Sequence, residues 1–230
     1  MPTCFQFALS NPTPGNEAEF NRWYGSEHLQ HGVLTPGISA GQFFHRIEGP
    51  WPWGKHDYLM VWELDDPAFA LAELAKARHG DTMPISPAID MSTVQPPTMW
   101  RRATVRSAAR VATDTAARKT VVLALMNSLQ GEEEKFLESL LSGHLVSLAD
   151  LPGVICAELL TLADEQIRGN ARKYRFGLFI ELTNEKQALE ALAVPLGSLP
   201  HLDTERWLAP VFRPLGRRMT TADAHAIANP

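Results

Sequence analysis

The stretch from Phe20 to Gly37 carries the densest polar chemistry of the chain. Read as a helix, it places six side chains on one face that is about 140° wide: Phe20, Trp23, Tyr24, Glu27, His28 and His31. This face has the aromatic anchors and is therefore expected to point inward. Ionisable groups on a buried face need partners or have displaced pKa values. A histidine in such surroundings can exchange a proton near neutral pH.

We therefore take His28, Tyr24 and His31 as candidate catalytic residues. His28 would move a proton, while Tyr24 and His31 would hold a substrate oxygen. The structural alternative for His28 is that it caps the end of its helix and fixes the turn to Pro36-Gly37. The alternative for His31 is a half-exposed position at the helix end.

The same stretch is part of an internal repeat with an offset of 116 residues, from Phe20 to Phe136. Without a gap, His28 then falls on His144 and Gly37 on Gly153. His144 is the second-copy equivalent of the candidate catalytic histidine. A histidine in both copies favours a structural role, because a scaffold needs it twice and a site needs it once.

Polar and aromatic residues that the second copy lacks are the candidates for substrate binding. Gln42 and His45 meet Glu158 and Thr161 in the repeat, and five of the six tryptophans lie in the first hundred residues. The predicted substrate-binding residues are Trp23, Glu27, Gln42, His45, Trp53 and Trp62. This asymmetry predicts a pocket in the N-terminal copy, with the second copy as its packing partner.

Composition restricts the partners of this 230-residue chain. The formal net charge is −5 and there is no long basic run, so nucleic acid is not expected. The N-terminus does not resemble a signal peptide and no stretch is apolar enough to span a membrane, so we expect a cytoplasmic protein without a membrane partner. Cys4 and Cys156 lie in predicted strands and are expected to be buried thiols. Exposed Trp51 and Trp53 would be compatible with a homodimer.

No metal or organic cofactor is expected. His28 and His31 lie one helical turn apart beside Glu27, but a third metal ligand at a suitable spacing is not visible. A lone histidine on an apolar face is not a haem motif, and there is no glycine-rich phosphate loop.

The remaining pattern predicts an α+β fold of two copies, each with the order βαββα and a closing strand. Expected strands of the first copy cover 4–10, 38–47, 58–64 and 99–105, and those of the second cover 120–126, 154–162, 174–182 and 211–213. The copies are expected to pack sheet to sheet. The expected division is 1–106 for the first repeat, 107–118 for a linker, 119–219 for the second repeat and 220–230 for a loose tail.

These features resemble the dimeric α/β-barrel superfamily, and within it the EthD-type domains. The resemblance rests on Phe20, Trp23-Tyr24, His28 and the run Leu34-Thr35-Pro36-Gly37. It implies two tandem ferredoxin-like repeats that form an intramolecular dimeric α/β barrel. The superfamily includes cyclases, dehydratases, isomerases, cofactor-free monooxygenases and haem-binding members, so the fold does not select one reaction.

The resemblance and the residues lead to a hypothesis of a cofactor-independent enzyme. It would act on a small apolar or aromatic, polyketide-like carbonyl compound in a cyclisation, dehydration or isomerisation. The first alternative is a non-catalytic binding or structural module of the same fold. A further alternative is a cofactor-free or metal-dependent monooxygenase.

Overall fold

The computed structural model describes residues 4–80, 82–107, 119–167 and 169–228. The elements of the first half are β1 (Cys4–Ser10), α1 (Glu17–Trp23), η1 (Tyr24–His28), α2 (Leu29–Leu34), β2 (Ile38–Ile47), β3 (Tyr58–Leu64), α3 (Pro67–His79) and β4 (Thr98–Arg106). Those of the second half are β5 (Val121–Met126), α4 (Glu133–Ser139), η3 (Leu140–His144), α5 (Leu145–Ala149), β6 (Val154–Leu162), η4 (Gly169–Lys173), β7 (Phe176–Leu182), α6 (Glu185–Gly197), β8 (Val211–Pro214), β9 (Met219–Thr220) and α7 (Thr221–Ala228). Except for Ser107, the predicted linker lies outside the described residues.

Local signals fixed several boundaries as predicted. β2, β3 and β6 have the expected bounds. Asp66 and Pro67 are a typical cap and first-turn residue of a helix, and α3 begins at Pro67 and ends before Gly80. The Asp66 side chain accepts a 3.0 Å hydrogen bond from the Phe69 backbone N–H, and a proline in the first helical turn loses no intrahelical bond.

The strands form one antiparallel sheet that closes into a barrel. Their order is β3-β1-β4-β6-β7-β5-β8-β2, and β2 pairs again with β3 to complete the ring. The short β9 pairs with β2 at Ala40 and Gly41, beyond the part of β2 that pairs with β8. Closure removes the exposed strand edges of an open sheet.

The two halves meet mainly through their strand edges. β4 of the first half pairs with β6 of the second, and β2 of the first pairs with β8 of the second. The predicted face-to-face packing of two separate sheets is therefore replaced by one continuous sheet. Its inner face buries a shared apolar core with five phenylalanines: Phe5, Phe7, Phe44, Phe179 and Phe212.

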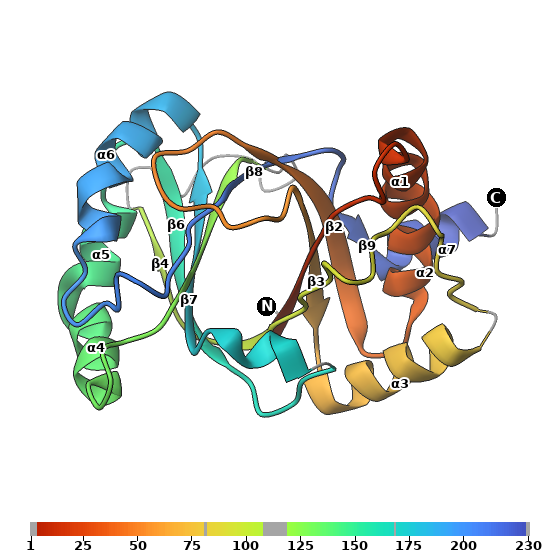
Figure 1. Ribbon diagram of the computed structural model, residues 1–230, viewed down its shortest axis with the longest axis horizontal. Helices are drawn as coiled ribbons and strands as arrows, with labels where there is room; N and C mark the ends of the chain where they lie inside the picture. The colour runs from red at the N-terminus through yellow and green to blue at the C-terminus, as the bar shows by residue number, and fades with distance from the viewer. Residues whose placement is uncertain (1–3, 81, 108–118, 168, 229–230) are drawn as a thin grey trace.

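Helices cover the outer face of the barrel in two separate layers (Figure 1). α1, α2, α3 and α7 lie beside the first half, whereas α4, α5 and α6 lie beside the second. Each layer encloses its own apolar core between helices and strands. No helix in the described ranges is long and apolar enough to cross a membrane.

The predicted loose tail is wrong for residues 221–228, which form α7. Ala224 is fully buried, and its carbonyl accepts a 3.4 Å hydrogen bond from the Gln30 side chain of α2. The Thr221 hydroxyl donates to the Ile38 carbonyl at 3.2 Å. The small side chains of α7, such as alanine, let this helix approach α2 closely. The small and polar composition of the tail did not indicate this packing.

Candidate functional site

A π-helical turn, η1, interrupts the first helix and sets the direction of its polar side chains. It places His28 in the centre of the buried face, 4% exposed. The His28 ring lies 4.6 Å from Trp23, 4.8 Å from Tyr24 and 5.9 Å from Trp62, measured between ring centroids. The structure thus brings together four of the predicted site residues.

The same turn overturns the predicted inward orientation of Glu27. Its side chain is 48% exposed and forms an ion pair with Arg22. The prediction assumed 100° per residue throughout, but a π turn bonds residues five apart and accommodates an extra residue per turn. This changes the phase and rotates Glu27 toward solvent.

His28 is held in its neutral form. Burial lowers its pKa to about 3, and the nearby positive charges of Arg78 and His31 act in the same direction. Its Nδ1 atom is buried without a hydrogen-bond partner among the described residues. The predicted capping role therefore receives no support at His28, whereas the Nδ1 of exposed His144 lies 2.7 Å from the Ser139 carbonyl.

The neutral state of His28 has a consequence for stability. Below pH 6.5 the unfolded chain gains a proton at His28 that the native state does not take up, so stability falls until about pH 3. Between pH 7 and pH 5 we expect a loss of about 2 kcal/mol from this group. Urea denaturation of wild type and His28→Gln at both pH values measures it, with His144→Gln as control. An equal pH dependence in wild type and His28→Gln would contradict the neutral buried form.

Tyr24 is stacked on His28 with an interplanar angle of 13°. Burial raises the pKa of its phenol, while the Ser10 hydroxyl and the charge of Arg78 act in the opposite direction. The phenol therefore stays protonated at neutral pH and can donate a hydrogen bond. Sequence reasoning missed Arg78, which lies on α3 and whose charge influences both Tyr24 and His28.

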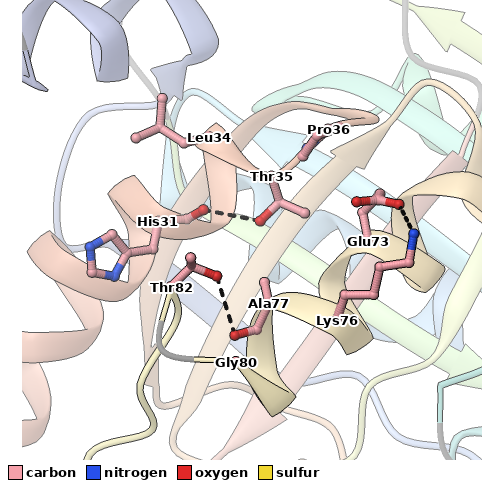
Figure 2. Close-up of a pocket in the computed structure, with 9 residues that line it drawn as sticks. All are labelled: His31, Leu34, Thr35, Pro36, Glu73, Lys76, Ala77, Gly80 and Thr82. Carbon is pink, nitrogen blue, oxygen red and sulfur yellow. Dashed lines mark hydrogen bonds and ion pairs between the residues drawn. The ribbon is translucent and has the colours of Figure 1, made fainter.

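His31 lines a groove of ≈ 510 Å³ between α2 and α3. The groove is formed by His31, Leu34, Thr35, Pro36, Glu73, Lys76, Ala77, Gly80 and Thr82. Figure 2 shows the His31 imidazole at one end and the ion pair between Glu73 and Lys76 at the other. His31 follows the buried His28 by about one helical turn, so the groove begins about one turn from the buried histidine.

A row of buried polar side chains crosses the sheet beneath the helices. Gln6 pairs with Trp62 of β3 and with Thr98 of β4. All three side chains are fully buried, and none of Gln6 Oε1, Gln6 Nε2, Trp62 Nε1 or Thr98 Oγ1 has a hydrogen-bond partner in the part of the chain that the structure describes. Such atoms are costly unless a polar occupant satisfies them. The signal in the sequence was Gln6, a polar residue within an otherwise apolar strand.

The second half has apolar residues at the equivalent positions. Val122 pairs with Ile180, as Gln6 pairs with Trp62, and both belong to the apolar core of that half. Leu140 occupies the place of Tyr24 and is fully buried. The polar site is thus confined to the first half.

Structural comparison places this chain among known folds. It is similar to an anthrone oxidase-like protein, with a TM-score of 0.69 and 12% identity, over 97% of this chain and 94% of that one. A candidate monooxygenase from Fusobacterium nucleatum gives 0.61 and 11%, over 94% and 93% of the two chains. Chlorite dismutase from Candidatus Nitrospira defluvii gives 0.58 and 10%, over 99% and 95%. The chain shares its fold, a closed antiparallel sheet covered on the outside by helices, with these three structures.

At these identities the likeness shows the fold of the chain, not its reaction. No protein-family model matches the sequence, and no curated protein is significantly similar to it.

Three predicted substrate-binding residues lie away from His28 in this α/β barrel. Gln42 alternates with Phe43 and points into the barrel, where its Nε2 donates to the Gly216 carbonyl at 2.8 Å. His45 is exposed at the end of β2, with its ring 4.9 Å from that of Tyr58. Alternation along the strand places Gln42 and Phe43 on opposite faces of β2, but only closure of the barrel determines which face points inward. The sequence therefore did not show that Gln42 points away from the site.

Trp53 is the third of these predicted substrate-binding residues that lie away from His28. The loop that carries it crosses to the second half, where the neighbouring Trp51 is 4% exposed and its indole donates to the Ala193 carbonyl at 3.2 Å. Trp53 is 47% exposed, with the Arg46 guanidinium 5.3 Å from its ring. Trp51 is therefore not available as the exposed dimer contact that we predicted.

The surroundings of His28 do not fit a metal or haem ligand. Within the described ranges, no three His, Cys, Asp or Glu side chains form a group that could hold a metal ion. Rings of Trp23, Tyr24 and Trp62 enclose the imidazole at 4.6–5.9 Å, which leaves no space for a porphyrin beside it.

Proposed function

We propose that this protein is a small-molecule enzyme that removes a proton from an aromatic or polyketide-like carbonyl compound. The observation that carries the proposal is the groove of ≈ 510 Å³ lined by His31, which begins about one helical turn from a buried and neutral His28. An apolar cleft with a few convergent polar groups and a perturbed histidine is typical of an active site. The first half supplies these groups.

Burial changes the roles that we assigned to the two histidines. A histidine with a pKa of about 3 is a weak proton acceptor, so His28 is better suited to position a hydrogen-bonding partner. His31 lines the groove and is therefore the proposed general base that contacts substrate. Tyr24 remains a proposed hydrogen-bond donor toward the substrate oxygen, beside the positive charge of Arg78.

The proposed first step gives an enolate. His31 takes a proton from the carbon that is acidified by the carbonyl, and the electron pair moves onto the carbonyl oxygen. Lys76 lines the groove and supplies positive charge near the developing anion. Return of the proton at another carbon is an isomerisation, and loss of hydroxide from the enolate, with its protonation to water, is a dehydration.

A second candidate is oxidation of the same enolate by dioxygen, without a cofactor. It is favoured by the names of the similar folds, an anthrone oxidase-like protein and a candidate monooxygenase. In this reaction a ring CH₂ group and O₂ give a C=O group and H₂O, and the enolate supplies the first electrons. Both candidates begin with proton removal, so they share the site and differ in the fate of the anion.

Anthrone, an aromatic ketone with an acidic CH₂ group, provides a test under anaerobic conditions in deuterated buffer. The proposal predicts that the protein accelerates exchange of the CH₂ protons for deuterium, measured by NMR, by at least about 100-fold over buffer. Admission of O₂ then shows whether one O₂ is consumed per quinone formed. Binding of anthrone without accelerated exchange would support the non-catalytic module instead.

We propose further that the two halves are tandem ferredoxin-like repeats of an EthD-like unit. The orders β4-β1-β3-β2 and β8-β5-β7-β6 correspond strand for strand. Asn11 bonds to the carbonyl of Lys55 and the N–H of Asp57, and Asn127 bonds in the same way to Lys173 and Arg175. If the two halves are equivalent, a packed pair of side chains in one half can be replaced by the corresponding pair of the other half. Variants at Gly32 and Trp62 test this prediction.

A further inference from the structure

We infer that the ion pair between Glu73 and Lys76 is a recognition element of the groove between α2 and α3, and that it binds a hydroxyl group of the ligand. The ligand class is an aromatic ketone with a free phenolic hydroxyl group near its carbonyl. This inference rests on the proposed function, because it concerns the same groove and names a further part of the substrate.

The groove presents different chemistry at its two ends. Figure 2 shows the His31 imidazole at one end and the ion pair between Glu73 and Lys76 at the other. Apolar side chains, among them Leu34 and Ala77, also line the groove. A volume of ≈ 510 Å³ lies within the usual range for a small-molecule site, and apolar walls suit a planar aromatic frame. When His31 contacts the carbon that loses its proton, the other end of this frame faces the ion pair.

The ion pair is accessible from the groove and contributes little to the fold. Lys76 Nζ donates to Glu73 Oε1, and the side chains of Lys76 and Glu73 are 72% and 22% exposed. Pairs with this exposure add little to stability, because water also solvates the separated charges. A carboxylate accepts several hydrogen bonds and an ammonium group donates three. Each group can therefore bind a ligand atom without leaving the other.

The second half lacks both charges of this pair. When α3 and α6 are aligned from their first residues, Glu73 falls on Ala191 and Lys76 on Val194. Val194 is 75% exposed, so an apolar residue is tolerated at this surface position. Both helices have the same length and a side-chain cap at the N-terminus, although only α3 carries the pair. A pair that the scaffold does not need and that lines the groove is suited to ligand binding.

The two opposite charges favour a neutral ligand group over an anion. A ligand carboxylate beside Lys76 would be repelled by Glu73, and the negative end of the α3 dipole lies at the same last turn. A hydroxyl group donates to the carboxylate and accepts from the ammonium group at once. A further N–H of Lys76 then donates to the neighbouring carbonyl oxygen, where negative charge develops in the proposed first step.

Four planar probes test the inference with the full-length chain: anthraquinone and its 2-hydroxy, 2-methoxy and 2-carboxylate derivatives. A hydroxyl at position 2 is too far from the carbonyl to bond to it internally. Absorbance titrations at about pH 6 keep the phenol neutral and the carboxylate ionised. Wild type should bind the hydroxy probe at least about fivefold more tightly than anthraquinone. The methoxy probe accepts but does not donate, so its affinity should stay within about twofold of that of anthraquinone.

Glu73→Gln should reverse the preference among these probes. The amide oxygen is a weaker acceptor than a carboxylate, so we expect most of the preference for the hydroxy probe to be lost. Removal of the like charge should raise the affinity for the carboxylate probe at least about threefold. Anthraquinone binding should change by less than about twofold, since this probe has no hydroxyl for Glu73.

Glu132→Gln is the matched control in the second half. Glu132 pairs with Lys135 at 2.9 Å with the same spacing along the chain, and their side chains are 29% and 64% exposed. This variant should bind all four probes as wild type does, because neither residue lines the groove. The melting temperature of Glu73→Gln should lie within about 2 °C of that of wild type.

Four outcomes would overturn the inference. Tightest binding of the carboxylate probe by wild type would mean that Lys76 serves an anion. An unchanged preference in Glu73→Gln would place the hydroxyl elsewhere, and an equal loss for every probe would mean that the pair only shapes the groove. If wild type binds no probe but accelerates anthrone exchange, the inference fails and the proposed function stands. Without binding and without exchange, both fall.

Discussion

Replacing His31 by Gln should lower the rate of anthrone proton exchange by roughly 10²- to 10⁴-fold, the usual contribution of a general base. His31 lines the groove and is the histidine that substrate can contact. Glutamine retains hydrogen bonding but accepts no proton at neutral pH. The free energy of unfolding should change by less than about 1 kcal/mol, since His31 is only partly buried.

The matched comparison uses His28→Gln and His144→Gln. His28→Gln should raise the KM and lower kcat to a smaller extent than His31→Gln, because His28 is assigned a positioning role. His144 is exposed in the second half, so its variant should retain wild-type exchange. Exchange by His31→Gln within about threefold of wild type would exclude His31 as the base. If His28→Gln alone abolished exchange, the proton would be transferred by the buried histidine.

Replacing Gly32 by Ala should destabilise the native state by about 2 to 3 kcal/mol, although alanine is the better helix former. A Cβ atom at Gly32 would lie 2.1 Å from Cη2 of Trp62, far inside van der Waals contact. Trp62 is also confined from the strand side, where a Cβ at Gly41 would lie 2.6 Å from its Cζ3. The ring therefore cannot move away cheaply. Urea denaturation measures the loss.

Two further variants separate steric pressure from a general effect of the substitution. Gly25→Ala in the same helix has only the Phe43 side chain at 3.2 Å and should change stability by less than about 1 kcal/mol. In the second half, Leu148 and Ile180 stand where Gly32 and Trp62 stand in the first. The double variant Gly32→Ala with Trp62→Ile should therefore be at least about 1 kcal/mol more stable than the sum of the single changes predicts. Strict additivity would contradict both the steric account and the equivalence of the halves.

The sequence by itself determined most of the elements of this protein and their order, apart from β9 and α7. Period-2 alternation and flanking turn residues defined β2, β3 and β6, and Asp66-Pro67 defined the start of α3, because these signals act within a few residues. The repeat also identified the helix that carries Tyr24, His28 and His31, since its equivalent lacks most of the polar residues. Local interactions are sufficient for such inferences.

Only the tertiary structure decided which side chains meet. The π turn moved Glu27 to the surface and His28 to the centre of the core, because one extra residue in a turn shifts the phase of every later side chain. Barrel closure turned Gln42 inward, away from the helices, since the two faces of a strand differ only in what covers them. Gln6 and Thr98 are far apart in the chain, and the pairing of β1 with β4 brings them together. Long-range strand pairing, which local spacing does not specify, thus determines the composition of the site.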